Sequence, residues 1–297
     1  KPENREMLTD TGLFYKLNRK NLTQYFQKIS DNPQLALDLG QRAGLRAMLV
    51  YNWDRIAYEY YKIITRLMAA KAVEKGKMPE FHNNVGQKIL MVGAGGMLGQ
   101  AMHEYFSKKY IVKATDIDAN EKWLSYLDVR DFSAYEKMVA AFKPNYIFHL
   151  AALTSLEDCE KNVSNAYATN TLAVKYAAQL ASRYEAKLIY ISSAGVFDGQ
   201  KECYTDNEEP KPINTYGLTK QMGALMAEYY ARDYLILRPG WMMGGGPGKD
   251  KKFVNHIVSQ IISGQKIIHA VTDKVGTPSY THDLAKNLDL LLKAGTI

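Results

Sequence analysis

A run of glycines between an apolar strand and an amphipathic helix is the feature that most constrains how this chain can fold. Residues Ile89–Val92 read as a short buried strand, and Gly93, Gly96 and Gly99 follow in the pattern G-x-x-G-x-x-G before a helix expected over Met97–Phe106. The first glycine permits a tight turn, the second lets backbone approach a pyrophosphate, and the third lets the helix pack close to the sheet. The helix N-terminus would offer N–H groups and a positive dipole to that anion. The loop therefore predicts a dinucleotide-binding α/β fold.

Strand and helix patterns alternate from Lys88 onward. We expect strands at Ile89–Val92, Tyr110–Thr115, Tyr146–Leu150, Lys187–Ile191 and Tyr234–Leu237. We expect helices at Met97–Phe106, Tyr135–Phe142, Ala166–Tyr184 and Tyr216–Tyr230. Such alternation implies a parallel sheet with helices on both faces. The predicted fold is a Rossmann-type doubly wound parallel sheet with a small, incomplete C-terminal substrate lobe, preceded by an α-helical N-terminal segment.

The first 85 residues follow a different pattern. Apolar residues recur at helical spacing over residues 22–29, 35–45 and 53–72, and residues 75–84 read as a linker. We therefore expect a helical segment with its linker over residues 1–85 and the dinucleotide-binding domain over residues 86–297. The first residue is not Met and the last ones follow an amphipathic segment, so we expect the chain to be part of a longer protein.

Composition and charge exclude several function classes. Apolar residues make up 46% and charged residues 23%, without an apolar run of the length that a membrane span needs. The chain opens without a signal peptide and holds only two cysteines, without metal-ligand spacing, so we expect a cytoplasmic protein with no metal site. Residues 1–86 hold fourteen Lys and Arg against nine Asp and Glu. This surplus indicates a solvated helical surface, with peripheral membrane contact as an alternative and nucleic acid disfavoured.

Two carboxylates lie where a dinucleotide's adenosine would be held. Asp116 follows the second predicted strand, 23 residues after Gly93, and can accept hydrogen bonds from ribose hydroxyls while repelling a 2′-phosphate. The cofactor is therefore NADH or NADPH, with NADH slightly favoured, although Lys113 and Lys122 weaken the preference. Asp128, in Leu-Asp-Val-Arg-Asp, lies where an adenine contact is expected, with a plain turn as the alternative.

Several motifs in order resemble the extended short-chain dehydrogenase/reductase family, and within it the dTDP-4-dehydrorhamnose reductase branch. They are VGAGGMLGQAM, LDVRD, IFHLAALTSLEDCEKN, YISSAGVFDG, PINTYGLTK, LRPGWMMGGG and DKVGTPSYTHDLA, spread over residues 87–294. The resemblance implies a nucleotide-sugar substrate. It also implies cofactor contacts from a set of eleven positions beyond Asp116, namely Gly93, Gly96, Met97, Leu98, Gly99, Asp128, Val129, Ala151, Ala152, Tyr216 and Lys220.

The resemblance also implies that Ser193, Tyr216 and Lys220 act together in catalysis. Reduction of a ketone needs a hydride at carbon and a proton at oxygen, and a phenol with a pKa of about 10 is a weak acid–base catalyst at neutral pH. A cation one helical turn away is expected to lower that pKa. Ser193, at the end of a strand, is expected to orient the carbonyl oxygen toward Tyr216.

Substrate contacts are expected from Asn214 and Trp241, and Arg238 is expected to meet a phosphate, with a core position for Trp241 and an ion pair for Arg238 as the alternatives. The run Lys249-Asp250-Lys251-Lys252 reads either as an exposed loop or as a cover for a diphosphate. Asn170 is expected either to hydrogen-bond the loop that carries Ser193 or to serve only as a polar helix residue. A homodimer is one alternative for the oligomeric state.

The chain departs from the branch directly after Ser193. Reductases of this branch carry Asp-Tyr where this chain has Ala194 and Gly195, and dehydratase relatives carry Asp-Glu. Because of this departure, the sequence does not identify the sugar of the substrate, and dehydration is disfavoured. The leading hypothesis is an NAD(P)H-dependent reductase of a nucleotide-linked 4-keto sugar. The alternatives are an NAD-dependent sugar-nucleotide 4-epimerase and a non-catalytic cofactor-binding subunit. Family members continue for several dozen residues past Leu292, so weak activity is expected of this chain alone.

A second resemblance concerns the N-terminal segment. TGLFY, NLTQYFQKISDNPQLALDLGQRAG and VYNWDRIAYEYYKII resemble the last elements of retaining glycosyltransferases, with an arbitrary helical extension as the alternative. The resemblance implies a glycosyltransferase–reductase fusion in deoxysugar biosynthesis.

Overall fold

The computed structural model describes residues 86–250, 252–268 and 276–293, together with positions 24, 27, 28, 30–32, 34, 35 and 38. The chain divides into two units, Lys1–Met78 and Pro79–Ile297. The helices predicted within residues 1–85 lie almost entirely outside the described residues, as do the motifs of the glycosyltransferase resemblance. The boundary expected at residue 85 stays a prediction. The predicted dinucleotide-binding domain falls within the second unit.

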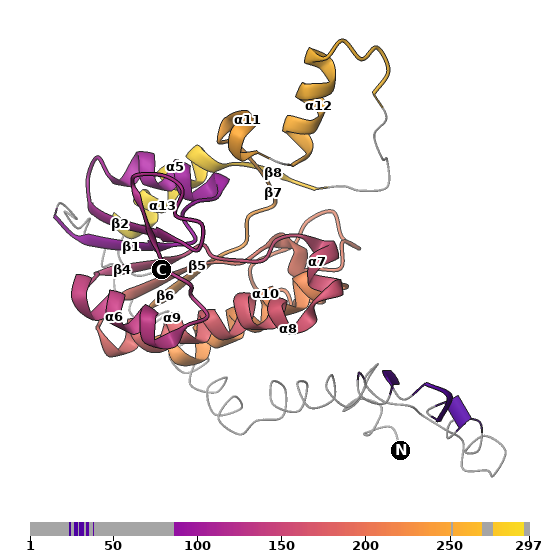
Figure 1. Cartoon of the computed structure of the whole chain (residues 1–297), viewed down its shortest axis with the longest axis horizontal. Coiled ribbons are helices and arrows are strands. Elements are labelled where there is room, and N and C mark those ends of the chain that lie inside the picture. The colour runs from indigo at the N-terminus through magenta and orange to yellow at the C-terminus, as the bar shows by residue number, and fades with distance from the viewer. Residues whose placement is uncertain are drawn as a thin grey trace, which may run out of the picture. The chain divides into compact units, whose positions relative to one another are not determined.

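A six-stranded parallel sheet forms the centre of the second unit, with strand order β3-β2-β1-β4-β5-β6 (Figure 1). Its strands are β1 (Lys88–Val92), β2 (Ile111–Asp116), β3 (Leu124–Tyr126), β4 (Tyr146–His149), β5 (Lys187–Ile191) and β6 (Tyr234–Leu237). A separate pair of parallel strands is formed by β7 (Trp241–Met243) and β8 (Pro278–Tyr280). The order reverses between β1 and β4, which is the arrangement of a doubly wound sheet. The predicted Rossmann-type fold is confirmed.

Helices cover both faces of the sheet (Figure 1). Those with residues in the cores on the two faces are α5 (Met97–Phe106), α6 (Phe132–Phe142), α9 (Ala173–Arg183), α10 (Thr215–Tyr230) and α13 (Thr281–Lys293). The other helices of the described part are α7 (Leu156–Lys161), α8 (Val163–Tyr167), α11 (Gly246–Lys249) and α12 (Phe253–Ile262). A π-helical turn, Ala168–Leu172, joins α8 to α9, and a 3₁₀ turn, Ala194–Val196, follows β5. Within the described residues, no helix combines the length and apolar character needed to cross a lipid bilayer.

Alternate residues of the central strand β1 pack into two separate hydrophobic cores, one on each face of the sheet. On one face, Ile89 and Met91 of β1 pack in a cluster with residues of α5 and α13. On the other face, Leu90 and Val92 of the same strand pack in a cluster with residues of α6, α9 and α10. All four side chains are fully buried. Because successive side chains of a strand point to opposite faces, an apolar run without alternation requires cover on both sides.

The structure departs from the predicted elements in ways that have local causes. The single helix expected over Ala166–Tyr184 is α8, a π-helical turn and α9 in succession, because residues 168–172 wind more widely than an α-helix. Strands β3, β7 and β8 each span only three residues, which is too short for a periodic pattern to reveal. Helix α12 has no buried residue and contributes little to either core.

One buried carboxylate fastens α13 to α5. Asp289 is 1% exposed and accepts hydrogen bonds from Tyr110 Oη (2.8 Å), Lys109 Nζ (2.8 Å), Lys293 Nζ (2.9 Å) and Tyr105 Oη (3.1 Å). Burial raises the pKa of this carboxyl, but the hydrogen bonds from the two lysines and two tyrosines outweigh it and bring the pKa down to about 2. The carboxylate therefore stays ionised and contributes to stability at neutral pH.

We predict that Asp289→Asn lowers the free energy of unfolding at pH 7 by about 2 kcal/mol, because two lysines lose their buried partner. In the wild-type chain the folded pKa lies below the unfolded one, so this contribution is complete above about pH 4 and is lost as the pH falls toward 2. Urea unfolding between pH 7 and pH 3 measures both effects. Asp283→Asn, on the exposed face of the same helix, is the matched control. Equal stability of the two variants at pH 7 would contradict the assignment.

Candidate active site

The switch point of the sheet brings the glycine loop against the loop that follows β4. Val92, His149 and Tyr190 stand at one level at the carboxyl ends of β1, β4 and β5. A Cβ built at Gly93 would lie 2.3 Å from the backbone N and Cα of Ala151, and Gly93 has a φ of 75°. Only glycine fits this turn, because both the space and the backbone conformation exclude a side chain. Ala152 follows in the same loop and is half-buried.

The glycine loop has the form that a pyrophosphate requires. A Cβ at Gly99 would lie 2.2 Å from the Ala94 carbonyl oxygen, so α5 packs directly on the loop. Gly96 is exposed, has open space where a side chain would stand, and forms the N-cap of α5 without any side-chain cap. The first N–H groups of α5, from Met97 and Leu98, lie beside that open space. These residues fit a dinucleotide, since uncapped N–H groups and the helix dipole favour an anion there.

The two predicted adenosine-side acids take different positions. Asp116 ends β2 and is tied to the glycine loop, because its Oδ2 accepts from Gly95 N (2.8 Å) and its Oδ1 from Asp118 N (2.9 Å). Asp128 lies beyond β3 and pairs with Arg130, whose Nη2 donates at 2.7 Å. That hydrogen bond is the main cause of the lowered pKa of Asp128. The neighbouring Val129 is 6% exposed.

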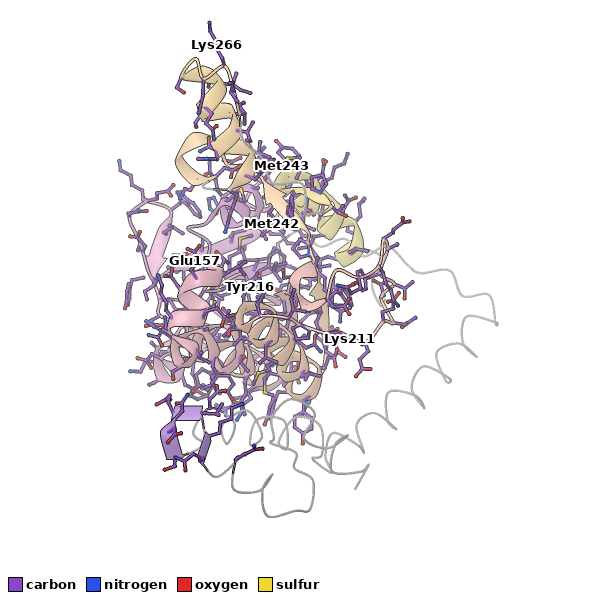
Figure 2. All side chains as sticks on the ribbon, turned by 90° about the vertical axis from the view of Figure 1, so that its right-hand side faces the viewer. Glu157, Lys211, Tyr216, Met242, Met243 and Lys266 are labelled. Atoms are coloured by element: carbon purple, nitrogen blue, oxygen red, sulfur yellow. The ribbon has the colours of Figure 1, made fainter. Side chains whose placement is uncertain are left out.

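Tyr216, in the first turn of α10 (Figure 2), forms a hydrogen bond with Ser193, which follows the end of β5. Ser193 Oγ accepts from Gly195 N (3.0 Å) at the start of the 3₁₀ turn. A Cβ at Gly195 would lie 3.2 Å from Ser193 Oγ and 3.5 Å from a ring carbon of Tyr216. A Cβ at Gly217 would lie 2.2 Å from the Gly195 carbonyl oxygen, so α10 packs directly on this turn. Gly217, directly after Tyr216, thus allows α10 to approach this turn closely, which was not predicted from the sequence.

Two side chains fix the start of α10. Asn214 is the N-cap, and its Oδ1 accepts from Gly217 N (2.8 Å). Glu160 of α7 accepts from both the backbone N and the hydroxyl of Thr215, each at 2.7 Å. These contacts supply acceptors to N–H groups that have no partner within the helix. Neither role was predicted from the sequence, although Asn is among the residues preferred at helix N-caps.

Lys220 is buried next to Ser193's strand. It is 2% exposed, donates from Nζ to the Ile191 carbonyl oxygen (2.6 Å), and lies 4.4 Å from the ring centroid of Tyr190. Burial lowers the pKa of this lysine to about 7. The predicted trio of Ser193, Tyr216 and Lys220 is therefore brought together at the carboxyl edge of the sheet.

The pKa of Tyr216 is shifted in the direction opposite to the one expected from the sequence. Burial raises it, and a hydrogen bond with Ser193 lowers it only in part. Lys220 was expected to lower this pKa, but with its own pKa near 7 the lysine loses its proton before the phenol does. A neutral amine offers no positive charge to stabilise a phenolate. Tyr216 is therefore a protonated phenol at neutral pH, as a proton donor needs to be.

Asn170 has a partner other than the predicted one. It lies in the π-helical turn, where its Oδ1 accepts from Leu153 N (2.8 Å) and its Nδ2 donates to the Leu153 carbonyl (3.0 Å) and to Thr219 Oγ1 (3.1 Å). Asn170 thus ties the loop after β4 to α10 rather than bonding the loop that carries Ser193. The wider turn projects this side chain between the two elements, which a helical pattern does not reveal.

Arg238 and Trp241, the other residues predicted to contact substrate, have partners outside the trio of Ser193, Tyr216 and Lys220. Arg238 Nη1 donates to the Asp206 carbonyl (3.4 Å), and its guanidinium carbon lies 5.7 Å from the Phe197 ring. Trp241 begins β7, is 47% exposed, and lies 6.4 Å from the ring of Phe253. The exposed position rules out the core alternative for Trp241. Their predicted contacts with a substrate stay predictions.

The described residues contain no group of three or more His, Cys, Asp or Glu side chains that could hold a metal ion. His149 is fully buried, with its Nδ1 3.4 Å from Tyr135 Oη, and burial lowers its pKa to about 3. Cys159 is a buried thiol whose pKa is raised, mainly by burial. Both side chains are neutral at pH 7.

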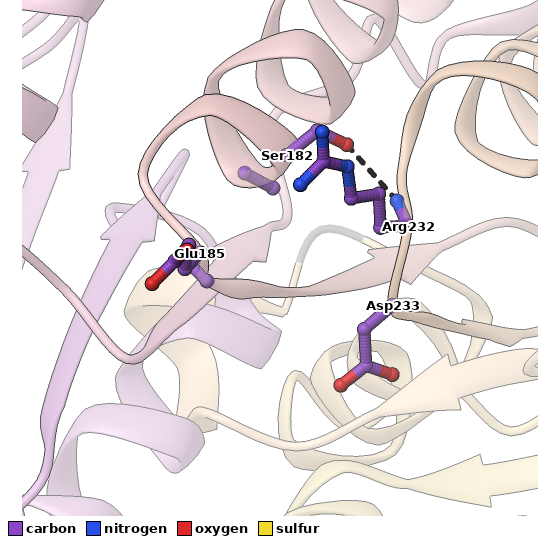
Figure 3. A pocket seen from close by; sticks show the side chains of 6 residues that line it. Ser182, Glu185, Arg232 and Asp233 are labelled. Carbon is purple, nitrogen blue, oxygen red and sulfur yellow. Dashed lines mark hydrogen bonds between the residues drawn. The ribbon is translucent and has the colours of Figure 1, made fainter.

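A small surface pocket lies at the opposite end of the sheet. Ser182, Glu185, Arg232 and Asp233 line it with two alanines, at the end of α9 and before β6 (Figure 3). Ser182 Oγ accepts from Arg232 N (2.9 Å) and donates to the Tyr230 carbonyl (2.6 Å). Ligands of open α/β sheets bind at the carboxyl ends of the strands. This pocket lies before the amino ends of β5 and β6, so it is separate from the candidate site.

Comparison with known proteins agrees with this geometry. The family model described as RmlD substrate binding domain matches residues 87–296. A dTDP-4-dehydrorhamnose reductase of Aggregatibacter actinomycetemcomitans is 30% identical over 207 residues, which cover 68% of this chain and 66% of that protein. The chain thus spans about two thirds of that relative's length.

Two solved structures show the same likeness. A dTDP-4-dehydrorhamnose reductase from Yersinia enterocolitica is 34% identical with a TM-score of 0.64, over 71% of this chain and 72% of that one. A dTDP-4-dehydrorhamnose reductase (rfbD) from Bacillus anthracis str. Ames, in complex with NADP, is 28% identical with a TM-score of 0.62, over 71% and 72%. The order of strands, the glycine loop and the family match lead to one conclusion: the chain belongs to the family of the RmlD substrate binding domain.

Proposed function

We propose that this chain is an NAD(P)H-dependent reductase of a nucleotide-linked 4-keto sugar, with dTDP-4-dehydrorhamnose as the first candidate substrate. One observation carries the proposal: a serine after β5, a half-buried protonated phenol and a buried lysine converge at the carboxyl edge of the sheet that also carries an uncapped glycine loop. The reductase relatives that match residues 87–296 support it.

The reaction adds one hydride and one proton to a carbonyl group, giving an alcohol. The nicotinamide cofactor, when bound, supplies the hydride. Tyr216 donates its phenolic proton to the carbonyl oxygen, because burial keeps the phenol protonated at neutral pH. Ser193 donates a hydrogen bond to the same oxygen and so holds it toward Tyr216. Lys220, which is close to half-protonated at pH 7, returns a proton toward Tyr216 after the transfer.

The cofactor would be held by the glycine loop and the loop after β4. Gly96, Met97 and Leu98 supply open space and N–H groups for the pyrophosphate. Asp116 accepts hydrogen bonds from the adenosine ribose while it keeps its bond from Gly95 N. The relative solved with NADP indicates that this family also takes a 2′-phosphate. We propose that both nicotinamide cofactors bind and that NADH binds slightly better.

A 4-epimerase, the alternative function, differs from a reductase in how tightly it holds its cofactor. An epimerase oxidises and re-reduces one sugar on the same cofactor and so retains NAD⁺ through purification. A reductase exchanges its cofactor at each turnover and releases it on dilution. Ala194 and Gly195 offer no acid–base pair, which makes simple reduction the better fit and disfavours dehydration.

We also propose, from the N-terminal resemblance alone, that residues 1–85 are a glycosyltransferase remnant and residues 86–297 the reductase domain. Such a fusion would make an activated deoxysugar and transfer it.

Tyr216→Phe should reduce kcat for a 4-keto nucleotide sugar by about 100-fold or more, because the variant lacks the proton donor. The Kd for NADH, measured by fluorescence titration, should stay within about twofold, because the substitution removes only one hydroxyl group and leaves the glycine loop unchanged. Tyr176→Phe on α9 is the matched control. Turnover by the Phe variant at the wild-type rate would remove Tyr216 from the mechanism.

Gly96→Val should abolish dinucleotide binding and leave the fold intact. The backbone at Gly96 has a φ of −79°, which any residue adopts, and the space around it is open. The added side chain would occupy the volume where a pyrophosphate approaches the helix N-terminus. Calorimetric titration with NADH and thermal unfolding measure the two effects. Unchanged NADH affinity would show that the dinucleotide lies elsewhere.

Lys220→Met should raise the free energy of unfolding at pH 7 by about 1 to 3 kcal/mol while it abolishes turnover. The folded pKa of about 7 lies below the unfolded value, so the unfolded state binds more protons between pH 7 and pH 10.5. The wild-type chain should therefore gain stability as the pH rises through this window, and the variant should not. Urea unfolding at pH 7 and pH 9.5 tests this. A variant less stable at both pH values would refute a buried lysine of lowered pKa.

A further inference from the structure

A glycine-rich segment carries a lysine onto the glycine loop from the far part of the chain. This segment, residues 244–250, is called the strap. It leaves β7 through three successive glycines of positive φ, Gly244 (140°), Gly245 (71°) and Gly246 (65°), and continues into α11. Such a run is strained for any other residue, so the path of the strap depends on glycine.

Tight contacts on two sides fix the strap. A Cβ at Gly244 would lie 2.2 Å from Thr281 Oγ1, and one at Gly245 would lie 3.3 Å from Met97 Cγ. Asp250, 4% exposed, closes the strap by accepting from Lys252 N (2.8 Å). The strap is therefore seated against the first residue of α5 and the first residue of α13. Its position over the glycine loop is built into the fold.

Among the described residues of the strap, Lys249 is the one whose side chain makes polar contacts with the sheet domain. Its Nζ donates to the Gly95 carbonyl oxygen (2.6 Å) and forms an ion pair with Glu121. Glu121 lies in the loop between β2 and β3, and its other carboxylate oxygen accepts from Trp123 Nε1 (2.8 Å). The hydrogen bond from Lys249 is the main cause of the lowered pKa of Glu121. Lys249 thus bridges the glycine loop and the loop that follows β2.

These are the two loops between which the adenosine half of a dinucleotide would lie. Gly95, whose carbonyl meets Lys249, donates its N–H to Asp116, the residue expected at the adenosine ribose. Lys249 and Glu121 remain 22% and 34% exposed, so an anion can reach the pair. A phosphate offers more acceptor oxygens and more charge than one carboxylate, and a lysine ammonium is a compact partner for it.

We propose that Lys249 binds a phosphate group of the dinucleotide, and that Glu121 holds the lysine in place until the phosphate displaces it. The inference rests on the proposed function, since it assigns a partner to the same cofactor site. The phosphate is either the pyrophosphate or the 2′-phosphate on the adenosine ribose. One ammonium group can bind either phosphate. Two ligands that differ only in the 2′-phosphate distinguish between these two possibilities.

The first test measures Kd for ADP-ribose and for 2′-phospho-ADP-ribose by calorimetry, without any turnover. Lys249→Met should weaken binding about 10-fold or more, as expected for loss of a hydrogen bond to a charged group. Equal losses for both ligands identify the pyrophosphate, and a larger loss for the second ligand identifies the 2′-phosphate. Lys266→Met, an exposed lysine after α12, is the control and should bind both ligands as the wild type does.

The second test uses the competing carboxylate. Glu121→Gln keeps an acceptor for Trp123 but removes the charge that holds Lys249. Each ligand that Lys249→Met binds more weakly should therefore bind to Glu121→Gln about threefold or more tightly than to the wild type. An ion pair that only braces the strap predicts the opposite, because its loss would loosen the site. The double variant should bind as Lys249→Met does.

Failure of this inference is distinguishable from failure of the proposed function. If the wild-type chain binds neither ADP-ribose nor NADH, the proposed function fails. If the wild type binds ADP-ribose and 2′-phospho-ADP-ribose and Lys249→Met binds each of them as tightly as the wild type does, only the role of Lys249 is overturned. Weaker binding by Glu121→Gln would overturn the displacement of Glu121.

Discussion

The close approach of α10 to the turn after β5 is the contact on which the candidate site depends. Gly217 lies directly against the Gly195 carbonyl oxygen, and no side chain fits between them. This contact sets Tyr216 beside Ser193 and, one helical turn later, carries Lys220 to the Ile191 carbonyl. The glycine loop follows β1, which is separated from β5 by β4 alone, so the loop and the trio lie at the same carboxyl edge of the sheet.

The site is assembled at a cost in stability, and other contacts offset it. A lysine with a pKa of about 7 is held in a buried position where a methionine would be more favourable. Around it, Asn170, Thr171 and Thr219 join the π-helical turn to α10 through buried hydrogen bonds. On the other face, Asp289 of α13 accepts from one residue of α5, from two residues shortly after α5 and from Lys293 of its own helix. The buried lysine of α10 and the buried carboxylate of α13 thus lie on opposite faces of the sheet.

Local patterns predicted most of the central sheet, and the family resemblance supplied the trio, whose catalytic role stays a prediction. Glycines at fixed spacing after an apolar strand determine the cofactor loop, and the Tyr-x-x-x-Lys spacing places both side chains on one face of a helix. The strands β5 and β6 and helix α5 begin and end where the sequence predicted. These features depend on neighbours in the sequence, which a single chain reveals.

Other features depend on residues far apart and could not be predicted. Lys249 meets Glu121 only because the strap folds back over α5, and Asn170 reaches Leu153 only because its helix widens by a π-helical turn. The raised pKa of Tyr216 reflects burial rather than the charge four residues away, so its direction was predicted wrongly. Burial is a property of the folded chain, and spacing alone does not reveal it.

Transfer of the cofactor's hydrogen to the sugar tests the central claim most directly. The chain would be given NADH deuterated at the reactive C4 position, together with dTDP-4-dehydrorhamnose, and the nucleotide sugar would be examined by mass spectrometry and NMR. A reductase site built from these residues predicts a product that carries one deuterium at C4 of the sugar, with one NADH oxidised for each sugar reduced. Oxidised cofactor without deuterium in the sugar, or a sugar that is epimerised while the cofactor is retained, would contradict a reductase site.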